Sequence, residues 1–342
     1  MVDFRYHLVS LISVFFALAI GVILGAGPLQ NSIGNVLQGQ VSDLRVNNEK
    51  LKATNAELQS VNEAHDRVFD ELASELMNDV LKGRAVAIVV LPGVNDSVIT
   101  AVSDRLSEAG ATVTGKANVQ ESWTLARQTT FRSSFADQIK SYVTSAANVS
   151  DTNTILALAL DQLARGGRNA NETLAGLMTG TDSPMLSIDG LEAKSDAVVV
   201  LTASVKPNGS SLDADEKAQA EYDATTFTAL SAELSNHGPT VIAGPMQNDG
   251  DIVRSLNESN ADVSTVDTIE SAIGAINCVL AVQAELNNSV VHVGFDGSAQ
   301  DVIAPRPLVK AAPQPADKQP EPQPAPAPAP APTAENPATS GS

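Results

Sequence analysis

The sequence predicts an α/β fold in which an N-terminal transmembrane helix and a coiled coil precede a Rossmann-like domain with a mostly parallel sheet. Three observations support it: an uncharged apolar run over residues 8–27, leucine-rich heptads over 37–72, and strand-like runs alternating with helical patterns after residue 84. Such alternation is typical of a parallel sheet. We expect a cytoplasmic N-terminus (1–7), a transmembrane helix (8–27), a coiled coil (35–82), an extracytoplasmic α/β domain (84–303) and a disordered tail (304–342).

The apolar run over 8–27 contains no Asp, Glu, Lys or Arg. A helix of this length rises about 30 Å, which matches the hydrocarbon core of a bilayer. Arg5 precedes it, so the positive-inside rule places the N-terminus in the cytoplasm and most of the chain outside the cell membrane. A cleaved signal peptide is the alternative, because Gly25-Ala26-Gly27 would suit a peptidase, although the apolar core of a signal peptide is usually about 7–15 residues.

Small residues recur on one face of the predicted membrane helix. Ala17, Gly21 and Gly25 are spaced by four, and this pattern lets two membrane helices approach closely. We interpret the three residues as a helix-packing face, although the same pattern arises by chance in apolar helices.

Heptads follow the membrane run. Position d holds Leu37, Leu44, Leu51, Leu58, His65 and Leu72, and position a holds Val41, Asn48, Asn55, Asn62, Phe69 and Leu76. Asparagine at position a favours two parallel strands in register. We predict a parallel homodimer through Leu37, Val41, Leu44, Asn48, Leu51, Asn55, Leu58, Asn62, Phe69 and Leu72. The alternative is a single long helix packed on its own domain, and His65 is better explained as a polar break in the seam than as a ligand.

The α/β pattern begins after Gly83. A continuous apolar run over 85–91 predicts a strand covered on both faces, and Asn95 or Asp96 can cap a helix that extends to about Ala109. Further strands are expected at 111–114, 197–202, 240–243 and 263–266, and the interval 118–190 is expected to be mostly helical, as an insertion or cap.

Composition limits the function classes. The net charge is −19, and without Asp3 and Arg5 the remainder is still 20 − 39 = −19. This acidity disfavours nucleic acid and anionic lipid as partners. Cys278 is the only cysteine, so no intramolecular disulfide can form, and its helical apolar surroundings predict a buried side chain.

Sequence motifs for catalysis, cofactors and metals fail or are missing. Gly110–Ala117 nearly fits the P-loop spacing, but Ala117 lacks the required hydroxyl and the segment runs from helix to strand, whereas phosphate binding needs strand to helix. The histidines and methionines are scattered, which leaves no sulfur cluster of the kind that Cu(I) prefers. We therefore expect no enzymatic activity and assign no catalytic, cofactor-binding or metal-ligating residue.

From Pro305 the chain becomes rich in proline and alanine. Such a composition cannot form a packed core, so we expect an extended, disordered tail.

Several segments carry a family resemblance: Arg5–Gly27, the heptads, Ala101-Val-Ser103, Val263–Ile269 and His292-Val-Gly294. Together they closely resemble the actinobacterial MctB "copper transporter" family over most of residues 1–297, and the proline-rich tail resembles its corynebacterial SteB branch. The resemblance implies one of two functions. MctB-like members limit intracellular copper and have been proposed as an outer-membrane pore, whereas SteB-like members support cell separation with a SteA-like membrane protein and a RipA-like peptidoglycan hydrolase.

The residues favour the second function. An outer-membrane pore needs a closed barrel or a ring of spanning helices, whereas the strands here are apolar runs interleaved with helices, unlike barrel strands. We expect a dimeric, single-pass, non-enzymatic envelope protein that contacts lipid through one helix and regulates a partner. Copper export, without a ligand motif, is the runner-up, and an envelope enzyme is third. Gly93, Asn95 and Gly244, near strand ends where α/β folds place sites, are the candidate partner-binding residues, although ordinary turns would look the same.

Overall fold

A computed structural model describes residues 4–26, 28–180, 182–204, 212–297 and 299–305. Seven strands form one sheet in the order β3-β2-β1-β4-β5-β6-β7, and every neighbouring pair is parallel except β2 and β3. The mostly parallel α/β fold is therefore confirmed. The strands are β1 (Ala85–Val90), β2 (Thr112–Val119), β3 (Leu186–Gly190), β4 (Ala197–Leu201), β5 (Thr240–Ala243), β6 (Ser264–Val266) and β7 (His292–Val293).

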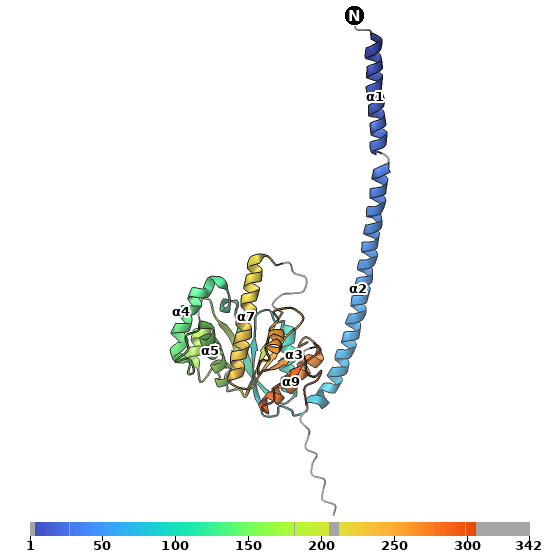
Figure 1. Ribbon diagram of the computed structural model, residues 1–342. Helices are drawn as coiled ribbons and strands as arrows, with labels where there is room; N and C mark the ends of the chain where they lie inside the picture. The colour runs from blue at the N-terminus through green and yellow to red at the C-terminus, as the bar shows by residue number, and fades with distance from the viewer. Residues whose placement is uncertain (1–3, 27, 181, 205–211, 298, 306–342) are drawn as a thin grey trace, which may run out of the picture. The chain divides into compact units, whose positions relative to one another are not determined.

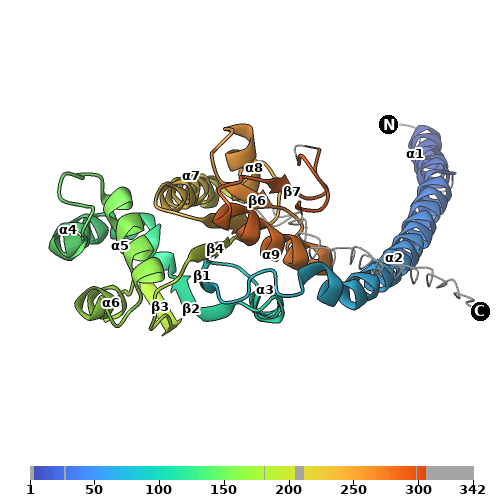
Figure 2. The ribbon, with the colours of Figure 1, turned by 90° about the horizontal axis from the view of Figure 1, so that it is seen from below.

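Helices cover both faces of the sheet (Figures 1 and 2). One hydrophobic core lies beneath α4 (Thr129–Ile139), α5 (Thr152–Gly166), α6 (Glu172–Thr179), α7 (Ala214–Asn236) and α8 (Ile252–Glu258), and the other lies beneath α3 (Asp96–Glu108) and α9 (Ala272–Leu286). Strand β1 is apolar throughout because both of its faces are buried. Ala87 and Val89 enter the first core, and Val86, Ile88 and Val90 enter the second.

The interval 118–190 is mostly helical, as predicted, but it is neither an insertion nor a cap. Helix α5 supplies buried residues to the first core, and its N-cap Asp151 accepts the Thr154 N–H at 2.8 Å. Strand β2 continues to Val119, beyond the expected end at residue 114, because β3 returns antiparallel beside it. Three short 3-10 helices complete the interval: Glu121–Trp123, Ala126–Gln128 and Lys140–Tyr142.

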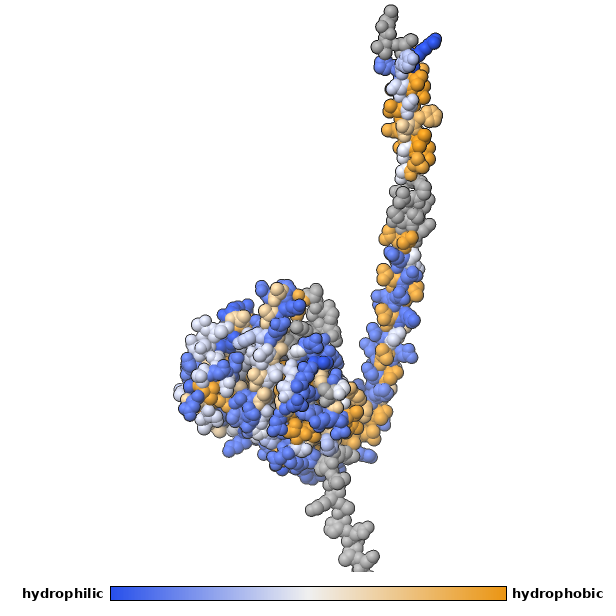
Figure 3. Space-filling view, in the orientation of Figure 1, coloured by the Kyte–Doolittle hydropathy of each residue, from blue (hydrophilic) through white to orange (hydrophobic). Residues whose placement is uncertain are grey.

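Two helices precede the sheet. Helix α1 (Phe4–Ala26) is, within the described residues, the one helix long and apolar enough to cross a membrane, and Figure 3 shows its largely hydrophobic side chains. Helix α2 (Pro28–Met77) begins earlier and ends sooner than the expected coil of 35–82. Proline is well tolerated at a first helical position, because no N–H is needed there. At the other end the chain turns, so that Leu81 is fully buried and its N–H donates to the Ala109 carbonyl at 2.9 Å.

The domain also ends differently from the expectation. Ala304 is buried, and its N–H donates to Asn277 Oδ1 at 3.1 Å, so the core includes a residue that the sequence assigned to the tail. The rest of the predicted tail, residues 306–342, lies outside the described residues. Cys278 is buried as predicted, and burial raises the pKa of its thiol to about 12.

Candidate functional site

The strand order creates a switch point between β1 and β4. The chain leaves β1 through α3 toward β2 on one side, while β4 leads to β5 on the other. Loops that leave adjacent strands in opposite directions open a crevice at their carboxyl ends, where open α/β sheets bind ligands. A groove of about 400 Å³ lies here, and we call it the switch-point groove; it is lined by Gly93, Val94, Asn95, Val98, Thr202, Ala203, Ser204, Pro245, Gln247, Asn248, Ile269 and Glu270.

Two of the predicted partner-binding residues line this groove. Asn95 is the N-cap residue of α3, but its side chain makes no capping hydrogen bond. The exposed amides of Asn95 and Gln247 have no hydrogen-bond partner within the described residues. Gly93 also lines the groove, with φ +89° and space for a Cβ only 3.2 Å from the Ala203 Cβ. Any substitution at Gly93 is therefore strained, which makes it a poor position for testing binding.

Gly244 does not line the groove. A Cβ there would fall against the Thr202 side chain, at 1.9 Å from Oγ1, so glycine is required for close packing of the β4 and β5 ends. Thr202 is 3% exposed, and its hydroxyl has no hydrogen-bond partner within the described residues. The structure thus gives Gly244 a packing role, and its expected binding role stays a prediction.

A polar cluster that the sequence did not reveal supports the groove. The Ser204 hydroxyl donates to Asp251 Oδ1 at 2.7 Å, and the Asn248 N–H donates to Asp251 Oδ2 at 2.8 Å. The Asn248 side-chain amide donates to Ser204 Oγ at 2.7 Å. Because the Asp251 carboxylate is fully buried, these bonds satisfy it and fix the loops after β4 and β5. The only sequence signal was an aspartate immediately before α8.

A second cavity, of about 530 Å³, connects the groove to α2, and we call it the coil pocket. It shares Pro245, Gln247, Ile269 and Glu270 with the switch-point groove, and its other lining residues are Asn62, His65, Asp66, Phe69, Thr268, Ser271, Ile273 and Phe295. Two predicted seam residues, Asn62 and Phe69, thus lie where α2 meets the sheet's carboxyl edge.

Helix α2 is fixed to the domain by its last turns. Asp66 Oδ1 accepts the Ala272 N–H at 3.0 Å, which places a carboxylate at the positive N-terminus of α9. Asp70 forms an ion pair with Arg105 of α3. Phe69 and Leu76 pack on the second core, and Ala73 and Met77 are buried in it. The alternative of a helix packed on its own domain therefore describes the end of α2.

The N-terminal part of α2, in contrast, is exposed. Leu37, Leu44, Leu51 and Leu58 are 54%, 67%, 64% and 55% exposed, and Val41 is 43% exposed. The seam residues Asn48 and Asn55 are exposed as well, and so is Leu72 at 44%. Near Phe69 the face of α2 that packs on the domain is therefore a/e, although Leu72 still occupies position d.

Metal ligands do not gather in the described part of the chain, which contains no group of three His, Cys, Asp or Glu side chains arranged to hold an ion. Met77, Met178, Met185 and Met246 are all buried, as is Cys278. His292 is half-buried, burial lowers its pKa, and its Nδ1 lies 2.8 Å from Thr265 Oγ1. Since the Thr265 hydroxyl donates to Asn257 Oδ1 at 2.6 Å, it accepts a hydrogen bond from the Nδ1–H of His292.

The segments Val263–Ile269 and His292–Gly294 meet beside the coil pocket. The buried Asp267 carboxylate accepts the N–H groups of Phe295 and Asp296, at 2.9 Å each from Oδ2. A Cβ on Gly294 would lie 1.9 Å from this carboxylate. Aspartate and glycine are therefore needed for the turn after β7, which positions Phe295 at the coil pocket.

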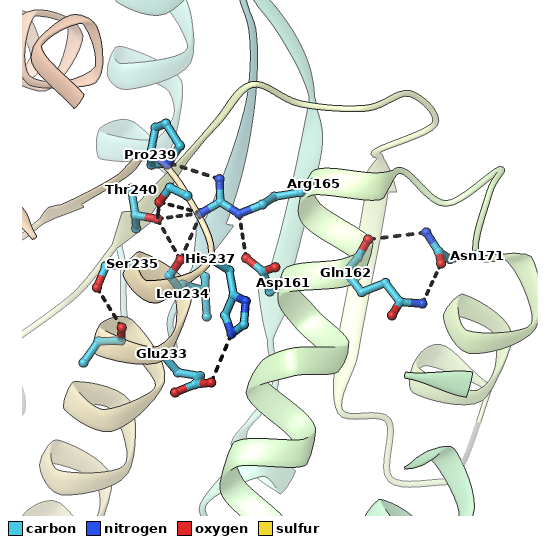
Figure 4. A network of polar contacts seen from close by, with 12 residues as sticks. Asp161, Gln162, Arg165, Asn171, Glu233, Leu234, Ser235, His237, Pro239 and Thr240 are labelled. Atoms are coloured by element: carbon cyan, nitrogen blue, oxygen red, sulfur yellow. Dashed lines mark hydrogen bonds and ion pairs between the residues drawn. The ribbon is translucent and has the colours of Figure 1, made fainter. Parts of the chain in front are cut away.

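The opposite, amino edge of the sheet holds a structural ion pair (Figure 4). Arg165 of α5 donates to Asp161 Oδ1 at 2.7 Å, to the Leu234 and Gly238 carbonyls at 3.0 Å each, to the Pro239 carbonyl at 3.2 Å and to Thr240 Oγ1 at 2.7 Å. Burial raises the pKa of Asp161, and the Arg165 charge opposes this rise. Arg165 thus joins α5 to the turn between α7 and β5.

Comparison with known proteins gives one consistent result. A family model described as "Copper transport outer membrane protein, MctB" matches residues 1–304. The "Copper transporter MctB" of Mycobacterium tuberculosis H37Rv is 26% identical over 329 residues, which cover 89% of this chain and 98% of that protein. The protein of the same name from Mycobacterium leprae is 25% identical over 326 residues, which cover 87% and 96%.

Proposed function

Because the chain belongs to the MctB family, whose model matches residues 1–304, we propose that it is a single-pass envelope protein that binds and regulates a protein partner in cell separation. The observation that supports this most directly is the chemistry of the switch-point groove. Within the described residues, Asn95 and Gln247 present amides without a hydrogen-bond partner, and Glu270 is the one charged side chain that lines the groove. An amide offers both a donor and an acceptor, which suits the peptide groups of a protein better than a copper ion.

In this proposal α1 anchors the chain with its N-terminus in the cytoplasm and the α/β domain outside. The uncharged helix behind Arg5 supports this orientation through the positive-inside rule. A reporter fused after residue 305 should be active only if it is a type that works outside the cytoplasm. Activity of a cytoplasm-dependent reporter at the same position would reverse the orientation.

The proposed protein is a parallel dimer. The exposed leucines of α2 and the three a-position asparagines support this, because burial of the leucines needs a second helix. Leu51→Cys should cross-link to its twin under oxidation, whereas Ala53→Cys, on the outer face, should not. The natural Cys278 is buried and leaves the introduced thiol as the reactive one. Equal cross-linking of both variants, or of neither, would contradict a seam through Leu51.

The partner role is tested by Gln247→Arg in cells whose own copy is replaced. Gln247 is exposed and lines both cavities, so the bulky cation should obstruct binding without unfolding the domain. We expect cells that remain attached after division. Asn236→Arg, an exposed position at the far edge of the sheet, is the matched control and should separate normally.

Copper transport is the second candidate, because the mycobacterial relatives carry that name. It predicts that cells lacking the chain accumulate copper. If such cells accumulate copper but separate normally, and Gln247→Arg has no effect on separation, copper transport replaces partner regulation.

A further inference from the structure

Strand β3 forms one edge of the sheet. The Gln120 N–H donates to the Met185 carbonyl at 3.0 Å, and the Leu191 N–H donates to the Thr114 carbonyl at 2.7 Å. Bonding residues alternate along an antiparallel pair, so residues 187 and 189 also face β2 in the observed register. The N–H and C=O groups of Leu186 and Ile188 consequently point away from β2. Leu186 is only 1% exposed, whereas Ile188 is partly exposed, so Ile188 is the accessible residue at this edge.

Beside this edge lies a groove of about 830 Å³, which we call the edge groove. Its β3 wall is formed by Leu186, Ser187 and Ile188, and its α6 wall by Glu172, Ala175, Gly176 and Thr179; Arg168, Asn169 and Pro184 complete the lining. Figure 2 shows α6 alongside β3. The α6 wall is built of small side chains, and a Cβ at Gly176 would meet nothing within 4 Å. A polypeptide backbone therefore has room beside the open strand.

The charges around the edge groove are unequal. Lys116 pairs with Asp189 at 3.2 Å, and Arg168 pairs with Glu192 at 3.7 Å. Glu172, at the start of α6, is exposed and has no ion pair within the described residues. The net charge of the chain is −19. An incoming segment with a basic side chain would meet an unpaired carboxylate.

We propose that the edge groove binds an extended, basic segment of another protein, which adds a strand to β3. Main-chain hydrogen bonds to Ile188 supply affinity, as in other cases of strand addition, and Glu172 selects a basic residue. A second copy of this chain is the poorer occupant, because it would bring a second unpaired Glu172 carboxylate to the interface and, among the described residues that line the groove, no unpaired cation. The edge groove is separate from the switch-point groove, so this inference does not rest on the proposed function.

The test uses the full chain in detergent micelles and a phage-displayed pool of random linear ten-residue peptides. We expect enriched peptides to carry Lys or Arg. Ile188→Pro should weaken their binding at least tenfold, because proline removes the outward N–H without breaking a bond to β2, a position where edge strands accept proline. Ile188→Val keeps that N–H and should bind as the natural chain does. Glu172→Lys should also weaken binding tenfold, whereas Glu221→Lys on α7 should not.

Residue-resolved amide exchange gives an independent readout. In the free chain the Ser187 and Asp189 amides should exchange slowly and the Ile188 amide quickly, and a selected peptide should slow exchange of the Ile188 amide. Failure to enrich any peptide, undiminished binding to Ile188→Pro, or self-association that Ile188→Pro abolishes would each overturn the proposal. Gln247→Arg should leave peptide binding unchanged, because Gln247 does not line the edge groove. Failure of the edge-groove proposal can therefore be told apart from failure of the proposed function.

Discussion

Replacing Arg165 with methionine should be among the most damaging single changes in the domain. The arginine side chain is 15% exposed and that of Asp161 is 13% exposed, so water screens the pair little. Methionine fills similar space but removes donors to Asp161, Thr240 and three carbonyls. Breaking a buried pair by removing one partner costs about 3–5 kcal/mol, chiefly because the other charge stays buried.

The assay is urea unfolding of the full chain in micelles, followed by the fluorescence of Trp123. This is the only tryptophan and is fully buried in the core that contains α5. With an m-value of about 2 kcal/mol per molar urea, a loss of 4 kcal/mol would lower the midpoint by about 2 M. Asp161→Asn should cost less, because it leaves the four other acceptors of Arg165 in place.

The pH dependence provides the internal check. Burial raises the pKa of Asp161, and loss of Arg165, whose charge lowers it, should raise the pKa further. A folded-state pKa above the unfolded value means that the folded chain binds more protons, so the penalty in Arg165→Met should shrink as pH falls through that raised pKa. A loss below about 1 kcal/mol at pH 7, or a penalty independent of pH, would refute a buried structural ion pair.

Three further changes test the site and its supports by the same unfolding measurement. Thr202→Val should stabilise the chain by about 1 kcal/mol, because it removes a buried hydroxyl without a partner; destabilisation would mean that the hydroxyl is bonded in solution. Asp66→Ala should cost about 1 kcal/mol by removing a carboxylate from the α9 N-terminus, whereas Asp43→Ala, on the exposed part of α2, should cost almost nothing. His292 has a lowered folded-state pKa, so its contribution to stability should fall as pH drops below the unfolded value of about 6.5. His292→Gln should therefore reduce the slope of the free energy of unfolding against pH in this range. An unchanged slope would contradict burial of His292 as a neutral ring.

Local patterns predicted most of the elements but few of their ends. Strand β5 was predicted at its observed residues, because Thr240–Ala243 is apolar and bounded by turns. Strand β7 was missed, since His292–Val293 has only two residues and no period to detect. The break at Met77 was missed as well, because the heptads show where a helix is amphipathic and do not show where its partner domain makes the chain turn.

The sequence alone determined the membrane-length apolar helix, the heptads, the buried cysteine and the alternation of strands and helices, because each depends on neighbours within a few turns. The tertiary structure decided which strands lie side by side, and hence which groove Asn95 and Gln247 both line and why Gly244 must be glycine. It also brought Arg165 to the carbonyls before β5 and left β3 at an edge. These contacts join residues dozens of positions apart, and only the burial of both sheet faces selects them from the many pairings that the same local patterns allow.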